Sequence, residues 1–305
     1  MAAATLHRLI LAGEFGVYLL IGILLTWKGG WTATQALGLG MLLFVIVRSL
    51  VISITFAFSR AHAARPPDAC RIGSGRAVAM FLNELAAFFL MFVLIVPFDR
   101  FFMGADRLGR GENGRLPVLL IHGYQCNRGF WLWLRRSLER AGWQVATISL
   151  NPVFNDIDDY AEQVSRRIED VCAATGAAQV MLVGHSMGGL VSRAYLRRYG
   201  KDRVAKLVTL GSPHHGSVLA KLGLGENGRQ MVPGSAWLAA LNAAGAVPLP
   251  PATVSIYSCH DNYVMPQDSS LLDGAKIVPL AGIGHIEMAF SPEIERLLLA
   301  ELAAD

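Results

Sequence analysis

A serine between two glycines, directly after an apolar run, is the residue best suited to chemistry in this sequence. The segment LVGHSMGGLV, residues 182–191, puts Ser186 where a strand would end and a helix begin. A sharp turn there needs Gly184 and Gly188, because larger side chains would collide with the neighbouring backbone. The free N–H groups at the helix start favour negative charge on a nearby oxygen. Ser186 is therefore predicted to be a nucleophile, the alternative being an ordinary serine in a glycine-rich loop.

The part of the chain that must hold this serine alternates short apolar runs with amphipathic segments. This alternation predicts a parallel sheet with helices on both faces. The expected strands are 118–121, 145–150, 180–183, 204–210, 253–258 and 277–280, and the expected helices are 128–141, 156–174, 187–199 and 291–303. The stretch 218–250 is apolar and punctuated by Gly and Pro, which is typical of a small cap over a pocket, although a packing role alone is the alternative.

Three apolar stretches, 9–27, 36–58 and 77–98, occupy the first hundred residues. Each is long enough to cross a hydrocarbon core of about 30 Å as a helix, whereas a cleaved signal peptide would explain only one of them. Buried core helices of a soluble protein are the alternative, but the mean hydropathy of +0.41 is high for such a protein. We therefore predict three transmembrane helices in residues 1–98 and a linker over 99–116.

The remaining residues, 117–305, are predicted to form the catalytic domain, with its cap at about 218–250. A fragment that begins near Leu116 is expected to be soluble and active, because the sequence pattern separates the two modules at the linker.

Each apolar stretch carries one ionisable side chain, namely Glu14, Arg48 and Glu84. If the helices alternate in direction, the three side chains lie at similar depth and can pair, which offsets the cost of charge in lipid. We interpret them as structural pairs, and a transport or proton path is the alternative.

Basic residues bear on the orientation of the membrane module. With alternating helices, Arg8 and four arginines between the second and third stretches lie on one side, which favours that side as cytoplasmic. Those four arginines are Arg60, Arg65, Arg71 and Arg76, and the opposing basic residues are Lys28, Arg100, Arg107, Arg110 and Arg115. The expected location is a bacterial inner membrane, with the catalytic domain on the extracytoplasmic side.

Charge and cysteine content exclude several function classes. The net charge of +4 arises in residues 1–98, and a neutral catalytic part argues against nucleic-acid binding. The four cysteines lack the spacing of a zinc site or of a dense disulfide framework. His214 and His215 are adjacent in a loop without a nearby carboxylate in the sequence, which makes a poor metal site. No metal and no cofactor are predicted.

Five motifs together resemble the α/β-hydrolase family, most closely its bacterial lipase and esterase branch. They are LLIHGY, GHSMGG, GSPHHGS, HDNYVMP and GIGH, and they extend from about Pro117 to the C-terminus. The resemblance implies the α/β-hydrolase fold, a mostly parallel sheet with helices on both faces. It also implies a catalytic triad in the chain order serine, acid, histidine.

The same resemblance assigns the remaining site residues. Asp261, just past the strand ATVSIYS, is the expected acid, and His285 is the base that takes the proton from Ser186. The backbone N–H groups of Tyr124 and Met187 are expected to form the oxyanion hole.

Other candidates for the acid and the base are weaker. Asp268 and Asp273 are alternative acids, but we interpret them as solvated loop residues. His122 precedes the serine and is expected to shape the oxyanion loop, and His260 is expected to be a loop histidine.

These features predict a membrane-anchored serine hydrolase that cleaves carboxylic esters, with an acyl or lipid substrate, through an acyl-enzyme. One alternative is an acyltransferase with the same triad. Another is a membrane transporter or scaffold with a vestigial hydrolase domain. The oligomeric state is not indicated by the sequence.

Overall fold

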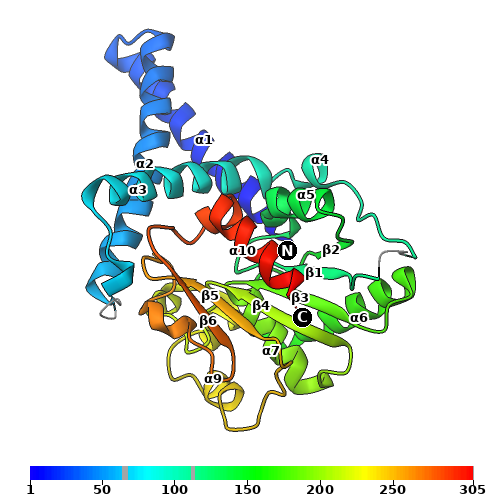
Figure 1. Ribbon diagram of the computed structural model, residues 1–305. Helices are drawn as coiled ribbons and strands as arrows, with labels where there is room; N and C mark the ends of the chain where they lie inside the picture. The colour runs from blue at the N-terminus through cyan, green and yellow to red at the C-terminus, as the bar shows by residue number, and fades with distance from the viewer. Residues whose placement is uncertain (64–67, 111–113, 305) are drawn as a thin grey trace.

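The computed structural model describes residues 1–63, 68–110 and 114–304 (Figure 1). Arg65 and residues 111–113 of the predicted linker lie outside these ranges. A six-stranded sheet with the order β2-β1-β3-β4-β5-β6 forms the centre of the molecule, and every neighbouring pair of strands is parallel. The strands are β1 (Val118–Ile121), β2 (Val145–Ile148), β3 (Val180–His185), β4 (Val204–Leu210), β5 (Val254–Ser258) and β6 (Lys276–Leu280).

Helices cover both faces of this sheet, as predicted. Successive strand residues point to opposite faces, so Leu119 and Leu120 belong to different core clusters although both are fully buried. Burial on both faces explains why the inner strands read as continuous apolar runs. One face packs against α5 (Leu132–Arg140) and α10 (Pro292–Ala303), and the other against α6 (Ile157–Thr175) and α7 (Met187–Tyr199).

The ends of these helices follow from local sequence. Asp156 begins α6, because its carboxylate accepts a hydrogen bond from the N–H of Asp158 at 2.7 Å. Gly176 ends the same helix in the left-handed conformation, with φ of 75°. Ser291 caps α10 directly before Pro292, a residue suited to the first helical position.

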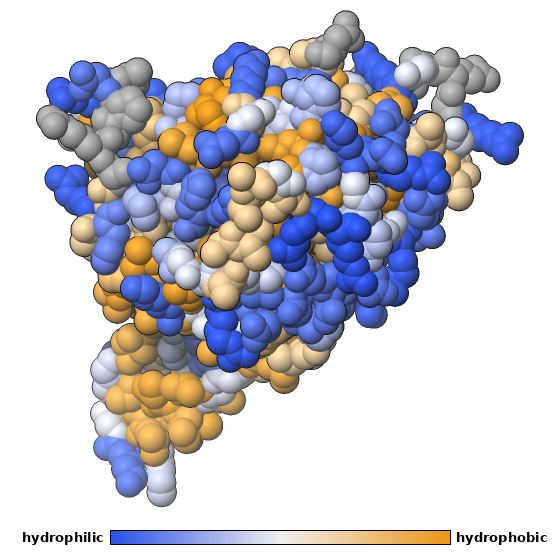
Figure 2. All heavy atoms as spheres, turned by 90° about the horizontal axis from the view of Figure 1, so that it is seen from below, coloured by the Kyte–Doolittle hydropathy of each residue, from blue (hydrophilic) through white to orange (hydrophobic). Residues whose placement is uncertain are grey.

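Two long apolar helices, α1 (Ala3–Gly29) and α2 (Ala33–Ala61), form a hairpin that projects from the catalytic domain (Figure 1). Their buried residues lie only at the ends next to that domain: Ala3, His7 and Leu11 on α1, and Arg48, Ile52, Thr55 and Ser59 on α2. A space-filling view shows a largely hydrophobic projection with polar groups at its outer end (Figure 2). Both helices are long and apolar enough to cross a membrane.

The third apolar segment lies across the catalytic domain. It consists of α3 (Ser74–Phe89) and a π-helical continuation, η2 (Leu90–Ile95), and it also has the length and composition of a membrane span. Near its start, Arg76 Nη2 donates to the carbonyl of Ala281 at 2.7 Å, and just past its end the carbonyl of Val96 accepts from Asn127 Nδ2 at 2.9 Å. Both ends are therefore bonded to the catalytic domain.

The polar residues of the apolar segments do not all meet, contrary to the prediction. Arg48 forms an ion pair with Glu14 at the base of the hairpin. Glu84 instead accepts hydrogen bonds from backbone N–H groups of the catalytic domain. The prediction failed because it assumed three helices side by side, whereas α3 lies on the domain.

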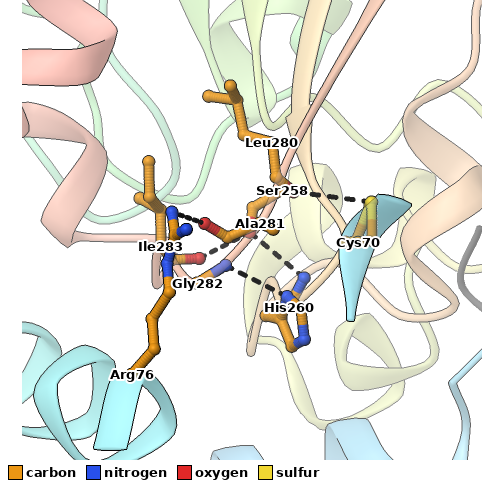
Figure 3. The surroundings of a disulfide bond; sticks show 9 residues. Cys70, Arg76, Ser258, His260, Leu280, Ala281, Gly282 and Ile283 are labelled. Carbon is orange, nitrogen blue, oxygen red and sulfur yellow. Dashed lines mark hydrogen bonds between the residues drawn. A yellow bond between two sulfur atoms is a disulfide. The ribbon is translucent and has the colours of Figure 1, made fainter. Parts of the chain in front are cut away.

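The loop between α2 and α3 also lies against the catalytic domain. A disulfide joins Cys70 of this loop to Cys259, which directly follows β5 (Figure 3). The expectation that this arginine-containing loop and the catalytic domain lie on opposite sides of the hairpin is therefore wrong. Within the predicted linker, Asp99–Met103 form the short helix α4.

Candidate active site

Ser186 lies at the turn between β3 and α7, in the geometry that the sequence predicts. Its backbone has φ of 53° and ψ of −124°, a strained conformation that residues other than glycine rarely adopt. A Cβ atom on Gly184 would lie 2.6 Å from backbone atoms of Gly188 and Gly189, and one on Gly188 would collide with the carbonyl of Ile121. The tight strand-to-helix turn therefore depends on both glycines.

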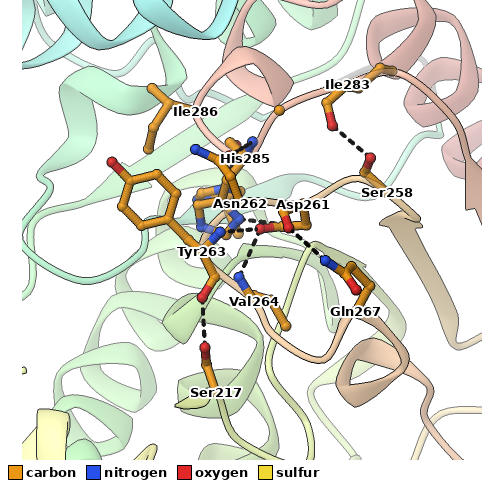
Figure 4. Close-up of polar contacts among 12 residues, drawn as sticks. Ser217, Ser258, Asp261, Asn262, Tyr263, Val264, Gln267, Ile283, His285 and Ile286 are labelled. Atoms are coloured by element: carbon orange, nitrogen blue, oxygen red, sulfur yellow. Dashed lines mark hydrogen bonds and ion pairs between the residues drawn. The ribbon is translucent and has the colours of Figure 1, made fainter. Parts of the chain in front are cut away.

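Asp261 and His285 form a buried pair. Asp261 Oδ2 lies 2.7 Å from His285 Nδ1, and the two residues are 1% and 3% exposed (Figure 4). The other carboxylate oxygen of Asp261 accepts from the N–H groups of Tyr263 and Val264, each at 2.8 Å. These bonds fix the carboxylate against the imidazole. The ring of Tyr263 stacks on that imidazole with a centroid distance of 5.2 Å.

The charge balance around His285 suits a base. Burial, the largest single influence, lowers the pKa of this histidine, but the charge and hydrogen bond of Asp261 together with the charge of Glu84 outweigh burial, and the net pKa lies above the ordinary value of 6.5. Asp261 thus stabilises the imidazolium that forms when His285 accepts a proton.

The loop after β1 lies against the serine. A Cβ atom on Gly123 would lie 2.9 Å from the Cβ of Ser186, so a glycine is needed for this close approach. The next residue, Tyr124, binds the cap through its hydroxyl, which donates to the carbonyl of Leu224 at 2.7 Å and accepts from its N–H at 2.8 Å. Met187 begins α7, where N–H groups lack partners within the helix.

The alternative histidines have structural partners. His122 bonds the carbonyl of Gly123 through Nδ1 and the N–H of Leu150 through Nε2, and burial lowers its pKa to about 4. His260 Nδ1 accepts from the N–H of Gly282 at 3.1 Å. Neither histidine lines the cavity that contains Ser186.

Asp268 and Asp273, the alternative acids, are both exposed. Of the adjacent histidines, His214 is fully buried and bonds Thr209 Oγ1 at 3.1 Å, whereas His215 is exposed.

One cavity of about 490 Å³ brings Ser186 and His285 together with Gly123 and Tyr124. Cap residues form one wall: Leu219, Ala220, Leu222, Gly223, Leu224, Gly228 and Met231. The N-terminal helices and η2 form another: His7, Ile10, Leu11, Arg48, Phe88, Phe92 and Val93. Most of these side chains are apolar, so the cavity suits a hydrocarbon group next to a reactive polar centre.

The contribution of the N-terminal helices to this cavity was missed from the sequence. His7 Nε2 also bonds the carbonyl of Gln125 in the loop after β1, at 2.9 Å. The available signal was the ionisable residue in each apolar stretch, Glu14, Arg48 and Glu84, which an apolar helix would carry only with a specific partner. The disulfide Cys70–Cys259 was also missed, because 189 residues separate its cysteines in sequence.

Comparison with known proteins shows which fold this arrangement belongs to. A family model described as the alpha/beta hydrolase fold matches residues 117–227, a range that contains Ser186, Tyr124 and Met187. The mature lipase BlEst2 of Bacillus licheniformis superposes with a TM-score of 0.58 at 17% identity, over 65% of this chain and 96% of that one. Residues 117–227 therefore match the α/β-hydrolase family model, and the chain has the α/β-hydrolase fold. Lipase B of Aspergillus fumigatus, another hydrolase, gives a TM-score of 0.58 at 21% identity, over 65% of this chain and 54% of that one.

The chain is also similar in sequence to bacterial lipases over part of its length. A triacylglycerol lipase of Pseudarthrobacter phenanthrenivorans is 36% identical over 114 residues, 35% of each chain. A triacylglycerol lipase of Burkholderia plantarii is 36% identical over 114 residues, 35% of this chain and 32% of that protein. The chain thus spans about a third of the length of these relatives.

Proposed function

We propose that this α/β-hydrolase is a serine esterase that cleaves carboxylic esters of lipids through Ser186, Asp261 and His285. The observation that carries the proposal is the buried Asp261–His285 pair, 2.7 Å apart, at a cavity that also contains the strained Ser186. A base held by a carboxylate, beside a hydroxyl at a strand-to-helix turn, is the arrangement that activates serine.

In this mechanism, Ser186 Oγ attacks the ester carbonyl while His285 Nε2 accepts the hydroxyl proton. The N–H groups of Tyr124 and Met187 stabilise the resulting oxyanion, and each such donor contributes about 3–4 kcal/mol. The intermediate expels the alcohol, which takes its proton from His285, and leaves an acyl group on the serine. Water then attacks the acyl-enzyme with His285 as base, and the carboxylic acid is released.

The cavity walls support a long acyl chain as the substrate group. Ile10, Leu11, Phe88 and Phe92 face the same cavity as Ser186, opposite Leu222 and Leu224 of the cap. Each buried methylene contributes about 0.8 kcal/mol, or roughly a fourfold gain in kcat/KM.

The α1–α2 hairpin supports attachment to a membrane. Residues 12–29 extend past the buried base of the hairpin and span roughly 27 Å at 1.5 Å per residue, close to the thickness of a hydrocarbon core. Trp27, Lys28 and Trp31 lie at its outer end, residue types that are common at membrane interfaces.

In this proposal the hairpin crosses the bilayer and α3 lies along the domain at the membrane surface, since both ends of α3 are bonded to the domain. This differs from the three crossings expected from sequence alone. An acyl chain can then enter the cavity from the lipid that surrounds α1 and α3.

The Cys70–Cys259 disulfide supports an extracytoplasmic catalytic domain, because disulfides form and persist in oxidising compartments. Arg8, Arg60 and Arg76 lie at the same end of the hairpin and would favour the cytoplasm. We give the disulfide more weight, because arginine bias is statistical and Arg76 has a structural role at Ala281.

The test is a series of p-nitrophenyl esters with graded acyl length, assayed on full-length protein in detergent. We expect kcat/KM to rise from acetyl to at least hexanoyl or octanoyl, and lipid esters in vesicles to be hydrolysed. A strict preference for acetyl esters would contradict a lipid substrate, and no ester hydrolysis at all would contradict the proposed function.

A further inference from the structure

The two catalytic loops are attached to the apolar N-terminal helices by a set of specific hydrogen bonds. The acid loop follows β5 and contains Asp261, and the histidine loop follows β6 and contains His285. Each loop contacts a different helix, and the bonds fall on residues next to the catalytic side chains.

Helix α3 holds the histidine loop through one carboxylate. Glu84 is fully buried, and its Oε1 and Oε2 accept from the N–H groups of Ile286 and Glu287 at 3.1 and 2.8 Å. Gly284 passes so close to this carboxylate that an added Cβ would collide with it. The carboxylate thus bonds the two residues directly after His285 and packs against the residue directly before it.

Helix α2 holds the acid loop through two hydroxyl groups. Ser59 Oγ donates to the backbone carbonyl of Asp261 at 2.7 Å and accepts from Gln267 Nε2 at 2.7 Å. Thr55 Oγ1 donates a hydrogen bond to the carbonyl of Ile52. The same oxygen accepts a hydrogen bond from Asn262 Nδ2 at 2.9 Å.

Asn262 joins the two loops. While its Nδ2 bonds Thr55, its Oδ1 accepts from the N–H of His285 at 3.0 Å. A continuous set of bonds therefore runs from Thr55 on α2 to the backbone of the histidine.

We propose that Glu84 is a positioning residue for His285, and that Thr55 and Ser59 have the same role for the acid loop, so that the apolar helices are part of the catalytic machinery. None of the three side chains touches the reacting atoms. Glu84 and Ser59 bond backbone atoms within two residues of a catalytic side chain, whereas Thr55 bonds the side chain of Asn262, which in turn bonds the N–H of His285. A displacement of about 1 Å at such a position can cost roughly 100-fold in rate. This inference rests on the proposed function.

Glu84→Gln separates positioning from packing, because glutamine keeps the shape but replaces one acceptor oxygen with an NH₂ group. One of the two backbone N–H groups then loses its acceptor and faces a donor. We expect kcat for p-nitrophenyl butyrate to fall roughly 10- to 100-fold while KM changes less than about twofold.

The pH profile gives a second readout. Burial lowers the pKa of His285, and the Asp261 carboxylate and, to a smaller extent, the Glu84 charge raise it. Burial raises the pKa of Glu84 itself to about 7, so Glu84 carries this charge over the upper part of the acidic limb. The acidic limb of kcat/KM is therefore expected to move to lower pH in Glu84→Gln, a change that loss of packing alone would not produce.

Glu295→Gln is the matched control. This carboxylate also accepts two hydrogen bonds, here from side chains, namely Trp133 Nε1 at 3.0 Å and Ser137 Oγ, but it connects α10 to α5 rather than to a catalytic loop. Thermal unfolding and membrane fractionation of both variants check that the fold is kept.

If Glu84→Gln does not fold, Ser59→Ala and Thr55→Val decide the question, since each removes one hydroxyl with its two hydrogen bonds. Each is expected to lower kcat with KM unchanged. The inference is overturned if Glu84→Gln retains the kcat and the pH profile of the wild type. Where that variant is unfolded, the inference is overturned if both Ser59→Ala and Thr55→Val retain the wild-type kcat. Failure of the proposed function is distinguishable, since the wild type would then show neither hydrolysis nor fluorophosphonate labelling at Ser186.

Discussion

Asp261→Asn changes one atom of the buried acid and should disable the base. Oδ1 could keep its bonds to the N–H groups of Tyr263 and Val264, which leaves the NH₂ group of asparagine facing His285 Nδ1 in place of Oδ2. An NH₂ group donates, so it selects the tautomer with the proton on Nε2. That nitrogen is the one that must accept the proton from Ser186.

The expected loss follows from the charge pair. A carboxylate and an imidazolium about 4 Å apart attract by about 4 kcal/mol at an effective dielectric constant of about 20, which is worth roughly three orders of magnitude in rate. The unfavourable tautomer adds to this loss. We therefore expect kcat to fall by roughly 10³- to 10⁴-fold, as in other triads in which this acid is replaced.

The assay is hydrolysis of p-nitrophenyl butyrate as a function of pH. In the wild type, activity should rise as His285 loses its proton, with a midpoint above 6.5 because the pKa of this histidine is raised on balance. Removal of the carboxylate charge lowers that pKa, so the midpoint should move to lower pH in Asp261→Asn while kcat falls.

Asp268→Asn is the control, because Asp268 is exposed and lies in the same region of the chain. It is expected to keep wild-type activity. An Asp261→Asn variant within tenfold of wild-type kcat, or an Asp268→Asn variant with the greater loss, would refute the assignment of the acid.

Three further predictions concern the N-terminal helices. The full chain should stay in the membrane fraction after an alkaline carbonate wash, because the exposed apolar surface of α1 and α2 would be in lipid; release into the supernatant would contradict a spanning hairpin. A reporter fused to the C-terminus should be active outside the cytoplasm, where the Cys70–Cys259 disulfide can form, and a cytoplasmic signal would reverse the proposed topology. Contrary to the expectation from sequence that a fragment beginning near Leu116 is active, this fragment should lose esterase activity even if it folds, because it lacks one wall of the cavity and the bonds to both catalytic loops; full activity would show that the helices are not needed.

The sheet and its helices could be predicted because their signals are local. β1, β4 and α7 have the predicted bounds, since apolar runs and helical periodicity depend on neighbouring residues. The turn at Ser186 could also be predicted, because Gly184 and Gly188 lie two residues on either side of it in the sequence. The close approach of Gly188 to the carbonyl of Ile121 in β1 became evident only in the fold.

The attachment of the helices to the site could not be predicted, because it depends on contacts between distant residues. Ile286 and Glu287 follow Glu84 by 202 and 203 positions, and no periodicity relates them. Composition classifies α3 with α1 and α2, although its contacts with the catalytic domain set it apart. The ionisable residue in each apolar stretch indicated that a partner must exist, and only the fold identified which partner each one has.

The most direct test of the central claim is to identify the residue that a fluorophosphonate probe modifies in the full-length protein. The reactive serine hydroxyl attacks the phosphorus and displaces fluoride, so a stable adduct should be found by mass spectrometry on the peptide that contains Ser186. The Ser186→Ala variant should show no adduct and no ester hydrolysis, with its thermal unfolding unchanged. An adduct on another residue, or hydrolysis that persists in Ser186→Ala, would contradict the account.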